Sequence, residues 1–171
     1  MACDITQGFT LDCNDSNAGL DKIFIANGPV QSITETAGTI TAITVGGSAL
    51  TPSDFFEFEV PRQTSSFTET INVSNENGTV FYDQALTMVF NKMEASKRDQ
   101  ILLMAQNNEM VVVFKDNNAK YWSVGIERGA YMTAGTATTS VAYGDRNGYE
   151  LTISGMEASP SFEVTGTIVE A

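Results

Sequence analysis

The stretch Ala95–Gly125, ASKRDQILLMAQNNEMVVVFKDNNAKYWSVG, places a strong helix signal directly before two strand signals. Its first part is made of good helix formers, and Asn107-Asn108 ends it. The next run, EMVVVFK, is too rich in β-branched valine to continue a helix and predicts a buried strand. KDNNAK then predicts a hairpin turn, and YWSVG predicts the strand that returns beside the first.

We expect one α-helix at about residues 92–106. Asn91 is the expected N-cap, with Glu94 reaching back toward it in a variant of the capping box. The side chains expected to share the buried face are Ile101, Leu102 and Ala105. The charged side chains expected to face solvent are Lys97, Arg98 and Asp99.

The rest of the chain is typical of strands separated by turns, because apolar and β-branched residues alternate with polar ones. The expected strands are 20–26, 38–45, 55–60, 67–73, 79–90, 109–115, 121–127, 130–136, 149–155 and 162–171. Asn75–Gly78 and Asn147-Gly148 are hairpin signals, since Asn and Gly tolerate positive φ. About nine to eleven strands and one helix predict a mainly β fold, either a β-sandwich or a partly closed barrel with one flanking helix.

Composition agrees with a folded chain. The 171 residues are 42% hydrophobic and 18% charged, which is outside the range of disordered proteins. That length suits one well-buried core, so residues 1–171 are expected to form a single domain.

The charge is strongly negative, with 21 acidic and 9 basic residues and a formal net charge of −12. Affinity for nucleic acid rests on Lys and Arg displacing counterions from phosphates, so DNA binding is not expected. The acidic balance either serves solubility or makes a surface to which DNA does not adhere.

The N-terminus has neither a basic region nor an apolar run of signal-peptide length, and no stretch approaches about 18 consecutive apolar residues. We therefore expect no membrane association and synthesis in a reducing cytoplasm, where Cys3 and Cys13 stay free thiols. Two cysteines without histidine cannot supply the four ligands of a zinc site.

A search for catalytic residues yields none, and no cofactor or metal site is expected. The chain has no histidine, no GxSxG elbow and no SxxK pair. Glu57 and Glu59 share one strand face and could imitate a glycosidase pair, but a solvated face explains them better. Asp116–Asn118 and Asp145–Gly148 offer oxygen ligands without an EF-hand series, so we expect turns there. Cys13 lies in an acidic stretch that disfavours a thiolate.

The aromatic side chains offer a further candidate site, since tyrosine and tryptophan stack on bases or sugars. The residues concerned are Tyr121, Trp122, Tyr131, Tyr143 and Tyr149. In strands, such residues more often serve the core or cross-strand pairs.

The second half of the chain resembles the tail tube proteins of tailed bacteriophages. The resemblance rests on the order of elements in 85–162: an apolar strand, a helix opening with SKRDQILLMAQ, a valine-rich strand and KDNNAKYWSVG. It continues in TAGTATTSVAYGDRNGYELTISGME, at Thr133–Glu157, and the N-terminal MACDITQGFTLDCNDSNAGLDKIFIAN is also similar to the start of such proteins. The similarity is weakest over 30–66.

This resemblance implies a virion structural protein, made in the host cytoplasm, that assembles with itself into stacked rings. The rings would form the tail tube through which the genome travels, in contact with other phage tail proteins. Strands of neighbouring subunits would then line each ring as a continuous sheet, and an acidic lumen would let DNA pass without adhering. The helix would fill the outer side of each subunit.

Some expectations stay open at this stage. Residues 46–66 form either a loop that bridges subunits or a simple hairpin. Three expected strands, 38–45, 67–73 and 162–169, carry neither Pro nor Lys and would be unprotected as sheet edges. The alternatives are a capsid-surface or head-completion protein and, in another class, a carbohydrate-binding β-sandwich that uses exposed aromatic residues.

Overall fold

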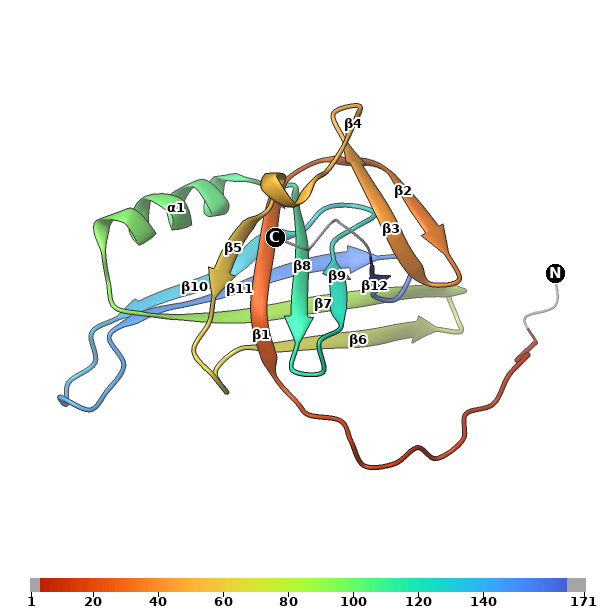
Figure 1. The fold of residues 1–171 in the computed structure, drawn as a ribbon, viewed down its shortest axis with the longest axis horizontal. Coiled ribbons are helices and arrows are strands. Elements are labelled where there is room, and N and C mark those ends of the chain that lie inside the picture. Colours follow the sequence, from red (N-terminus) through yellow and green to blue (C-terminus); the bar gives the residue numbers. More distant parts are fainter. Residues whose placement is uncertain (1–3, 166–171) are drawn as a thin grey trace.

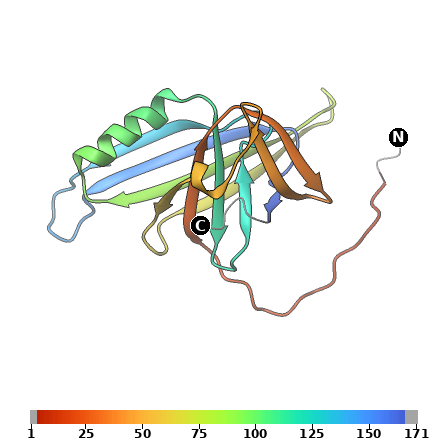
Figure 2. The same ribbon diagram turned by 45° about the horizontal axis from the view of Figure 1, so that its top comes forward.

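The computed structural model describes residues 4–165, and residues 1–3 and 166–171 lie outside the described part. It contains two β-sheets and one α-helix, which confirms the mainly β fold and the sandwich rather than the barrel. The strands of the two sheets cross steeply, one sheet lying over the other (Figure 1). The helix α1 (Ala95–Gln106) lies beside strand β10 (Tyr131–Thr138), at one end of the smaller sheet (Figures 1 and 2).

The larger sheet has eight strands and is mixed. Its strand order is β2 (Val30–Thr36), β3 (Thr39–Val45), β12 (Glu163–Val164), β9 (Tyr121–Val124), β8 (Met110–Asp116), β1 (Leu20–Asn27) and β5 (Phe56–Glu59), and β4 (Ser48–Ala49) pairs with β3. The β12–β3 pair is parallel, and the other pairs are antiparallel.

The smaller sheet has four strands, all antiparallel. Its order is β10 (Tyr131–Thr138), β11 (Gly148–Glu157), β7 (Thr79–Asn91) and β6 (Ser66–Ser74). β7 pairs without a register shift with β11 over Tyr82–Asn91 and with β6 over Thr79–Thr87, so β7 and β11 form the centre of this sheet.

The main core lies between the two sheets. The side chains that fill it include Ile23, Ile25, Val112 and Phe114 from the larger sheet and Leu86, Met88, Leu151 and Ile153 from the smaller one. These positions alternate along each strand, which is why the sequence shows period-two hydrophobicity there. Phe67 and Phe114 pack against each other across the layers, with ring centroids 4.7 Å apart and ring planes tilted by 39°.

A second core lies on the opposite face of β1 and β8, where β2 and β3 curl over. Its buried side chains include Phe24, Val111, Val113, Ile40, Ile43 and Phe55. β8 is therefore covered on both faces, which explains the unbroken valine run that predicted a buried strand.

One buried polar network joins the two layers. The Gln84 side chain is 2% exposed; its Nε2 donates to Glu69 Oε2 (3.0 Å), and its Oε1 accepts from the Gly125 backbone N–H (3.0 Å). Glu69 Oε2 also accepts from Ser161 N (2.7 Å) and Ser161 Oγ (2.9 Å). Because each group is paired, burial of these polar atoms costs little and fixes the relation of β6 and β7 to the turn after β9.

The helix exists where it was predicted, but its cap and its buried face differ from the prediction. Glu94, not Asn91, is the N-cap residue and makes no side-chain capping bond, while Lys97 Nζ donates to the Asn91 carbonyl oxygen at 2.7 Å. Lys92, with φ of 67°, turns the chain before the helix can begin, and this excludes 92–94 from it.

Leu102 was predicted to be buried and is 48% exposed; Leu103 is 58% exposed. The buried helix residue is Met104, Ile101 is half-buried against the main core, and Ala105 is exposed. The helix rests on the sheet through a narrow line of contact, so the rest of its apolar surface faces outward.

Two further differences concern strands. The prediction left out β2. Its side chains are largely exposed, so its sequence VQSITET is mostly polar and lacks the apolar alternation that indicates a strand. The expected strand 162–171 is seen as β12 at Glu163–Val164, and residues 166–171 lie outside the described part. The segment 46–66 divides into the short strand β4, a 3₁₀ turn (Pro52–Asp54) and β5.

Candidate functional site: an open-edged sheet with an acidic face

The four-stranded sheet is open at both edges among the described residues. β6 pairs with β7 alone, and β10 pairs with β11 alone. Because every pair is antiparallel, β10 and β7 run in one direction and β11 and β6 in the other. The two edge strands therefore run in opposite directions, and each presents unpaired backbone groups along one side.

Neither edge strand carries the devices that usually prevent association. β6 (SFTETINVS) and β10 (YMTAGTAT) contain no Pro, Lys or Arg. Of the three unprotected strands named from the sequence, 67–73 is confirmed as an edge. β3 lies inside its sheet, and so does the described part of 162–169. β10 was missed as an edge, although its lack of any charged residue was a visible signal.

The outward face of this sheet, turned away from the larger sheet, is mainly polar. Along β11 the core residues Leu151 and Ile153 alternate with Thr152 and Ser154, which are half-exposed. Thr87 and Ala85 stand directly opposite Thr152 and Ser154 on β7. On this face, Thr133 Oγ1 and Ser154 Oγ lie 3.0 Å apart in a hydrogen bond. The outward face is thus built largely of small and hydroxyl side chains, and its exposed larger side chains are Phe81, Tyr131 and Met156.

All formal charge within the four strands is negative. No Lys or Arg occurs in β6, β7, β10 or β11. By alternation, Asp83 and Glu150 lie on the outward face, whereas Glu69 and Glu157 point inward. Arg146, in the loop between β10 and β11, forms an ion pair with Glu150 at 2.6 Å. The 9 basic residues of the chain therefore lie outside these strands.

The β6–β7 hairpin extends past the end of the larger sheet and leaves apolar side chains uncovered. Val73 stands opposite Val80, and the exposed fractions are 63% and 52%. Ile71, two residues before Val73 on the same face, is 61% exposed. This inner face continues the core beyond the sandwich, so it suits contact with another protein surface.

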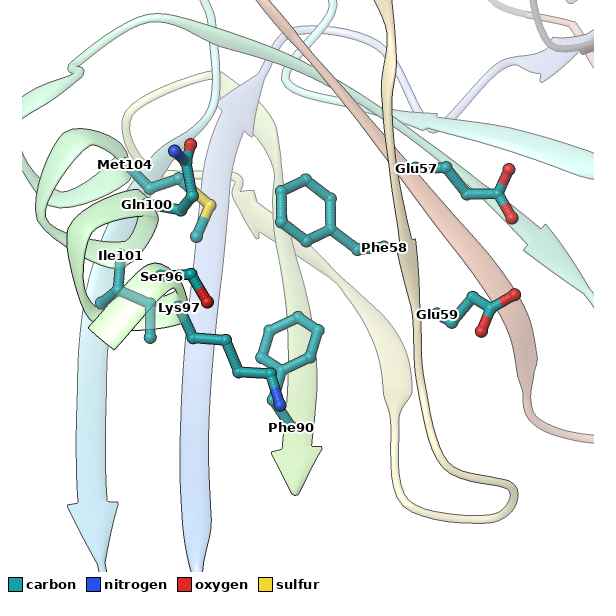
Figure 3. A pocket seen from close by; sticks show the side chains of 9 residues that line it. All are labelled: Glu57, Phe58, Glu59, Phe90, Ser96, Lys97, Gln100, Ile101 and Met104. Atoms are coloured by element: carbon teal, nitrogen blue, oxygen red, sulfur yellow. The ribbon is translucent and has the colours of Figure 1, made fainter. Parts of the chain in front are cut away.

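A groove lies between β5 and α1. Phe58 and Phe90 point into it from β5 and β7, and Ile101 and Met104 from the helix (Figure 3). Phe58 and Phe90 are in contact with ring centroids 6.0 Å apart. The cavity measures about 290 Å³, and an adjoining cavity of about 380 Å³ continues along β5 past Phe56 and Leu103.

The residues considered as sites in the sequence lie apart and have local structural partners. Glu57 forms an ion pair with Lys22 at 2.5 Å, on the side of β5 away from the groove (Figure 3). Asp116 Oδ1 accepts from the backbone N–H of Asn118 (2.8 Å) and of Lys120 (2.9 Å), as the predicted hairpin turn requires. Asp145 Oδ2 likewise accepts from the Ala142 N–H at 3.0 Å.

The five aromatic residues do not share one surface. Tyr149 is buried, Tyr121 and Trp122 are half-buried, and Tyr131 and Tyr143 are exposed on β10 and on the following loop. Within residues 4–165, no group of three or more Cys, Asp or Glu is placed to hold a metal ion.

Two sequence expectations concern the thiols and the membrane. Cys13 is exposed and unpaired, while Cys3 lies outside the described residues, so the state of both thiols in the cell stays a prediction. In the described part of the chain, no helix is long and apolar enough to cross a bilayer.

Comparisons with known proteins give little. No protein-family model matches the chain, and no curated protein matches it. Among solved structures, it is similar to a chain from a structure titled "Virion of native gene transfer agent (GTA) particle". The TM-score is 0.39 with 10% sequence identity, over 64% of this chain and 89% of that chain. A likeness of this strength assigns no family.

Proposed function

We propose that this chain is a virion structural protein that assembles with itself into stacked rings forming a phage tail tube. The observation that carries the proposal is the four-stranded sheet, open at both edges and free of basic residues. The proposal assigns the chain no catalytic site, cofactor or metal. It places the protein in the virion tail, beside other tail proteins, after synthesis in the host cytoplasm.

The sheet geometry supports closure into a ring. Because β6 and β10 run in opposite directions, β6 of one copy can lie antiparallel to β10 of the next under a simple rotation. Such a head-to-tail contact repeats around an axis, so that both β6 and β10 of every copy become paired. The result is a closed barrel with four strands from each subunit and no unpaired edge.

The side-chain pattern supports a lumen on the outward face. In such a barrel, the larger sheet and the helix lie outside and the outward face of the smaller sheet lines the channel. That face carries hydroxyl groups with Asp83 and Glu150, and its strands carry no Lys or Arg. The one cation placed beside these carboxylates, Arg146, is already paired with Glu150, so a phosphate backbone passing such a wall would not adhere.

The test is electron microscopy in negative stain together with light scattering, over a range of protein concentrations at low and high salt. We expect rings or tubes whose amount rises with concentration. Added salt should preserve or strengthen them, because it screens repulsion between subunits of charge −12. A protein that stays monomeric at high concentration in both salts would contradict the tube and favour a capsid-surface role.

A matched pair of variants tests the edge contact. Ala137 lies on β10 opposite Tyr149, so Ala137→Lys adds an inward-pointing charge to the proposed contact edge. Ser32→Lys adds the same charge to β2, the edge of the larger sheet. Both positions are exposed, so both variants should fold. We expect Ala137→Lys to abolish particles and Ser32→Lys to leave them.

A further inference from the structure

The N-terminal segment, residues 4–12 (DITQGFTLD), has the pattern of a strand but belongs to no sheet. Ile5, Phe9 and Leu11 are 94%, 101% and 102% exposed. Together with Gln7 they occupy alternate positions, and Asp4, Thr6, Gly8, Thr10 and Asp12 occupy the others. That alternation is typical of a strand with one buried face. The segment thus carries an apolar face that its own subunit does not cover.

The segment leaves the body from a fixed point at the β8–β9 turn. Asn17 N donates to Asn118 Oδ1 at 2.7 Å, and Asn118 Nδ2 donates to the Asn17 carbonyl oxygen at 2.9 Å. Asn117 Nδ2 also donates to the Ala18 carbonyl oxygen at 2.6 Å. Residues 4–16, extended at about 3.3 Å each, reach roughly 40 Å, which is about the diameter of a compact chain of this size.

The groove between β5 and α1 has the form that an added strand requires. β5 pairs with β1 on one side, and its other side faces the helix across the groove. Phe90 of β7 forms the floor, and Ile101 and Met104 form the opposite wall (Figure 3). A strand lying there would pair its backbone with β5 and set alternate side chains on an apolar floor, as in β-strand addition.

The charge around the groove is mixed. Glu57 and Glu59 border the groove, and the chain next to it carries Lys92, Lys97 and Arg98 together with Glu94 and Asp99. Residues 4–16, called the arm below, carry Asp4, Asp12 and Asp15. Residues 2–21 contain no Lys or Arg. A strand seated in the groove would therefore be held by backbone pairing with β5 and by apolar burial rather than by net charge.

We infer that residues 4–12 of one copy insert as an extra strand beside β5 of a neighbouring copy. The side chains of Phe9 and Leu11 then cover Phe58 and Met104. The neighbour is the expected acceptor because the arm extends toward the side of the molecule opposite its own groove (Figures 1 and 2). This inference rests on the proposed self-assembly and adds a second contact, distinct from the β6 and β10 edges.

Disulfide trapping between two separate variants tests the inference in the full chain. In a Cys3→Ser, Cys13→Ser background, one protein carries Phe9→Cys and the other Gln100→Cys, which lines both parts of the groove. Mixed and oxidised at assembly concentrations, they should give a covalent heterodimer. The control partner is Asn77→Cys, exposed in the β6–β7 turn, which should give at least tenfold less.

Three trapping results would overturn the inference. They are equal yields with Gln100→Cys and Asn77→Cys, particles without any heterodimer, and a crosslink that forms within one chain carrying both Phe9→Cys and Gln100→Cys. The last result would mean that the arm folds into its own groove.

The protein concentration at half-assembly of arm variants tests the inference independently of crosslinking. We expect Phe9→Ser with Leu11→Ser to raise the protein concentration at half-assembly at least tenfold. Thr6→Ser with Thr10→Ser, on the opposite face of the arm, should leave it unchanged. If the wild type forms particles and all variants match it, arm exchange is wrong and the tube stands. If no particles form but the Phe9–Gln100 crosslink does, the tube is wrong and arm exchange stands.

Discussion

At the scale of single residues, Glu157 has an unusual environment. Its side chain is 2% exposed, and its carboxylate accepts from the backbone N–H of Glu127 (3.0 Å) and of Arg128 (3.2 Å). Its pKa is raised to about 7, chiefly by burial and also by the nearby Glu127 carboxylate, against the lowering effect of the two backbone bonds. Its ordinary value is 4.5, so folding favours the protonated form.

This shift predicts a stability that falls as pH rises. The folded chain binds more protons than the unfolded chain between pH 4.5 and about 7, so the contribution of Glu157 is full below 4.5 and is lost as pH rises through about 7. We expect the free energy of unfolding to fall by about 1–3 kcal/mol from this group. Glu157→Gln should remove that slope in urea unfolding from about pH 5 to 8. Glu76→Gln, in an exposed turn, should keep it, and an unchanged slope in Glu157→Gln would contradict the assignment.

Gly148 supports a second residue-scale prediction. A Cβ at this position would lie 1.9 Å from the Phe90 carbonyl oxygen, which belongs to the paired strand β7 and cannot move aside. Gly148→Ala should therefore destabilise the fold by about 1–3 kcal/mol or more, as overpacking does. Gly144→Ala, where nothing lies within 4 Å, should change stability by less than about 0.5 kcal/mol. Equal midpoints in thermal unfolding would show that the two strands can separate locally at Gly148.

At the scale of elements, the helix contributes one buried side chain and an exposed apolar surface. We expect Met104→Ala to cost about 2–5 kcal/mol, because Met104 is 8% exposed in the main core. Leu102→Ala should cost less than about 0.5 kcal/mol, because Leu102 is 48% exposed. Chemical denaturation of both variants checks this, and the reverse order of effects would mean that the helix is rotated from the position described.

At the scale of the whole molecule, the distribution of charge predicts behaviour toward DNA. The wild type should not retain a DNA duplex, and Asp83→Lys with Thr87→Lys should create binding on the outward face of the smaller sheet. That binding should weaken as salt rises, since it depends on released counterions. Fluorescence anisotropy of a labelled duplex measures the binding of the wild type and of the variant at each salt concentration. Ser32→Lys with Glu35→Lys, on β2, is the control with the same change in net charge: equal binding there would mean that net charge, not the position of the face, excludes DNA.

Several features could be predicted from the sequence because they depend on neighbours along the chain. Alternating apolar residues gave the strands around Ile23, Leu86 and Leu151, and local turn chemistry gave the turns at Asn75–Gly78 and Asp116–Asn118. The existence of the helix followed from its helix formers, and its end at Asn107 followed from the Asn pair. The absence of basic residues from the four strands can also be read from the sequence, but the sequence does not show that these strands form one sheet.

The tertiary structure alone decided which residues are covered, because cover comes from segments far apart in the chain. Leu102 and Met104 are both good helix formers with apolar side chains, and only the position of the sheet leaves Leu102 exposed. The strand VQSITET was missed since an exposed strand lacks hydrophobic alternation, and β10 became an edge only because no described strand lies beyond it. Glu157 acquires its raised pKa from the turn that buries it, and the groove beside β5 exists because the helix stands away from that strand. Sequence determined the elements through local periodicity, and the arrangement of the layers determined which surfaces are free to meet another copy.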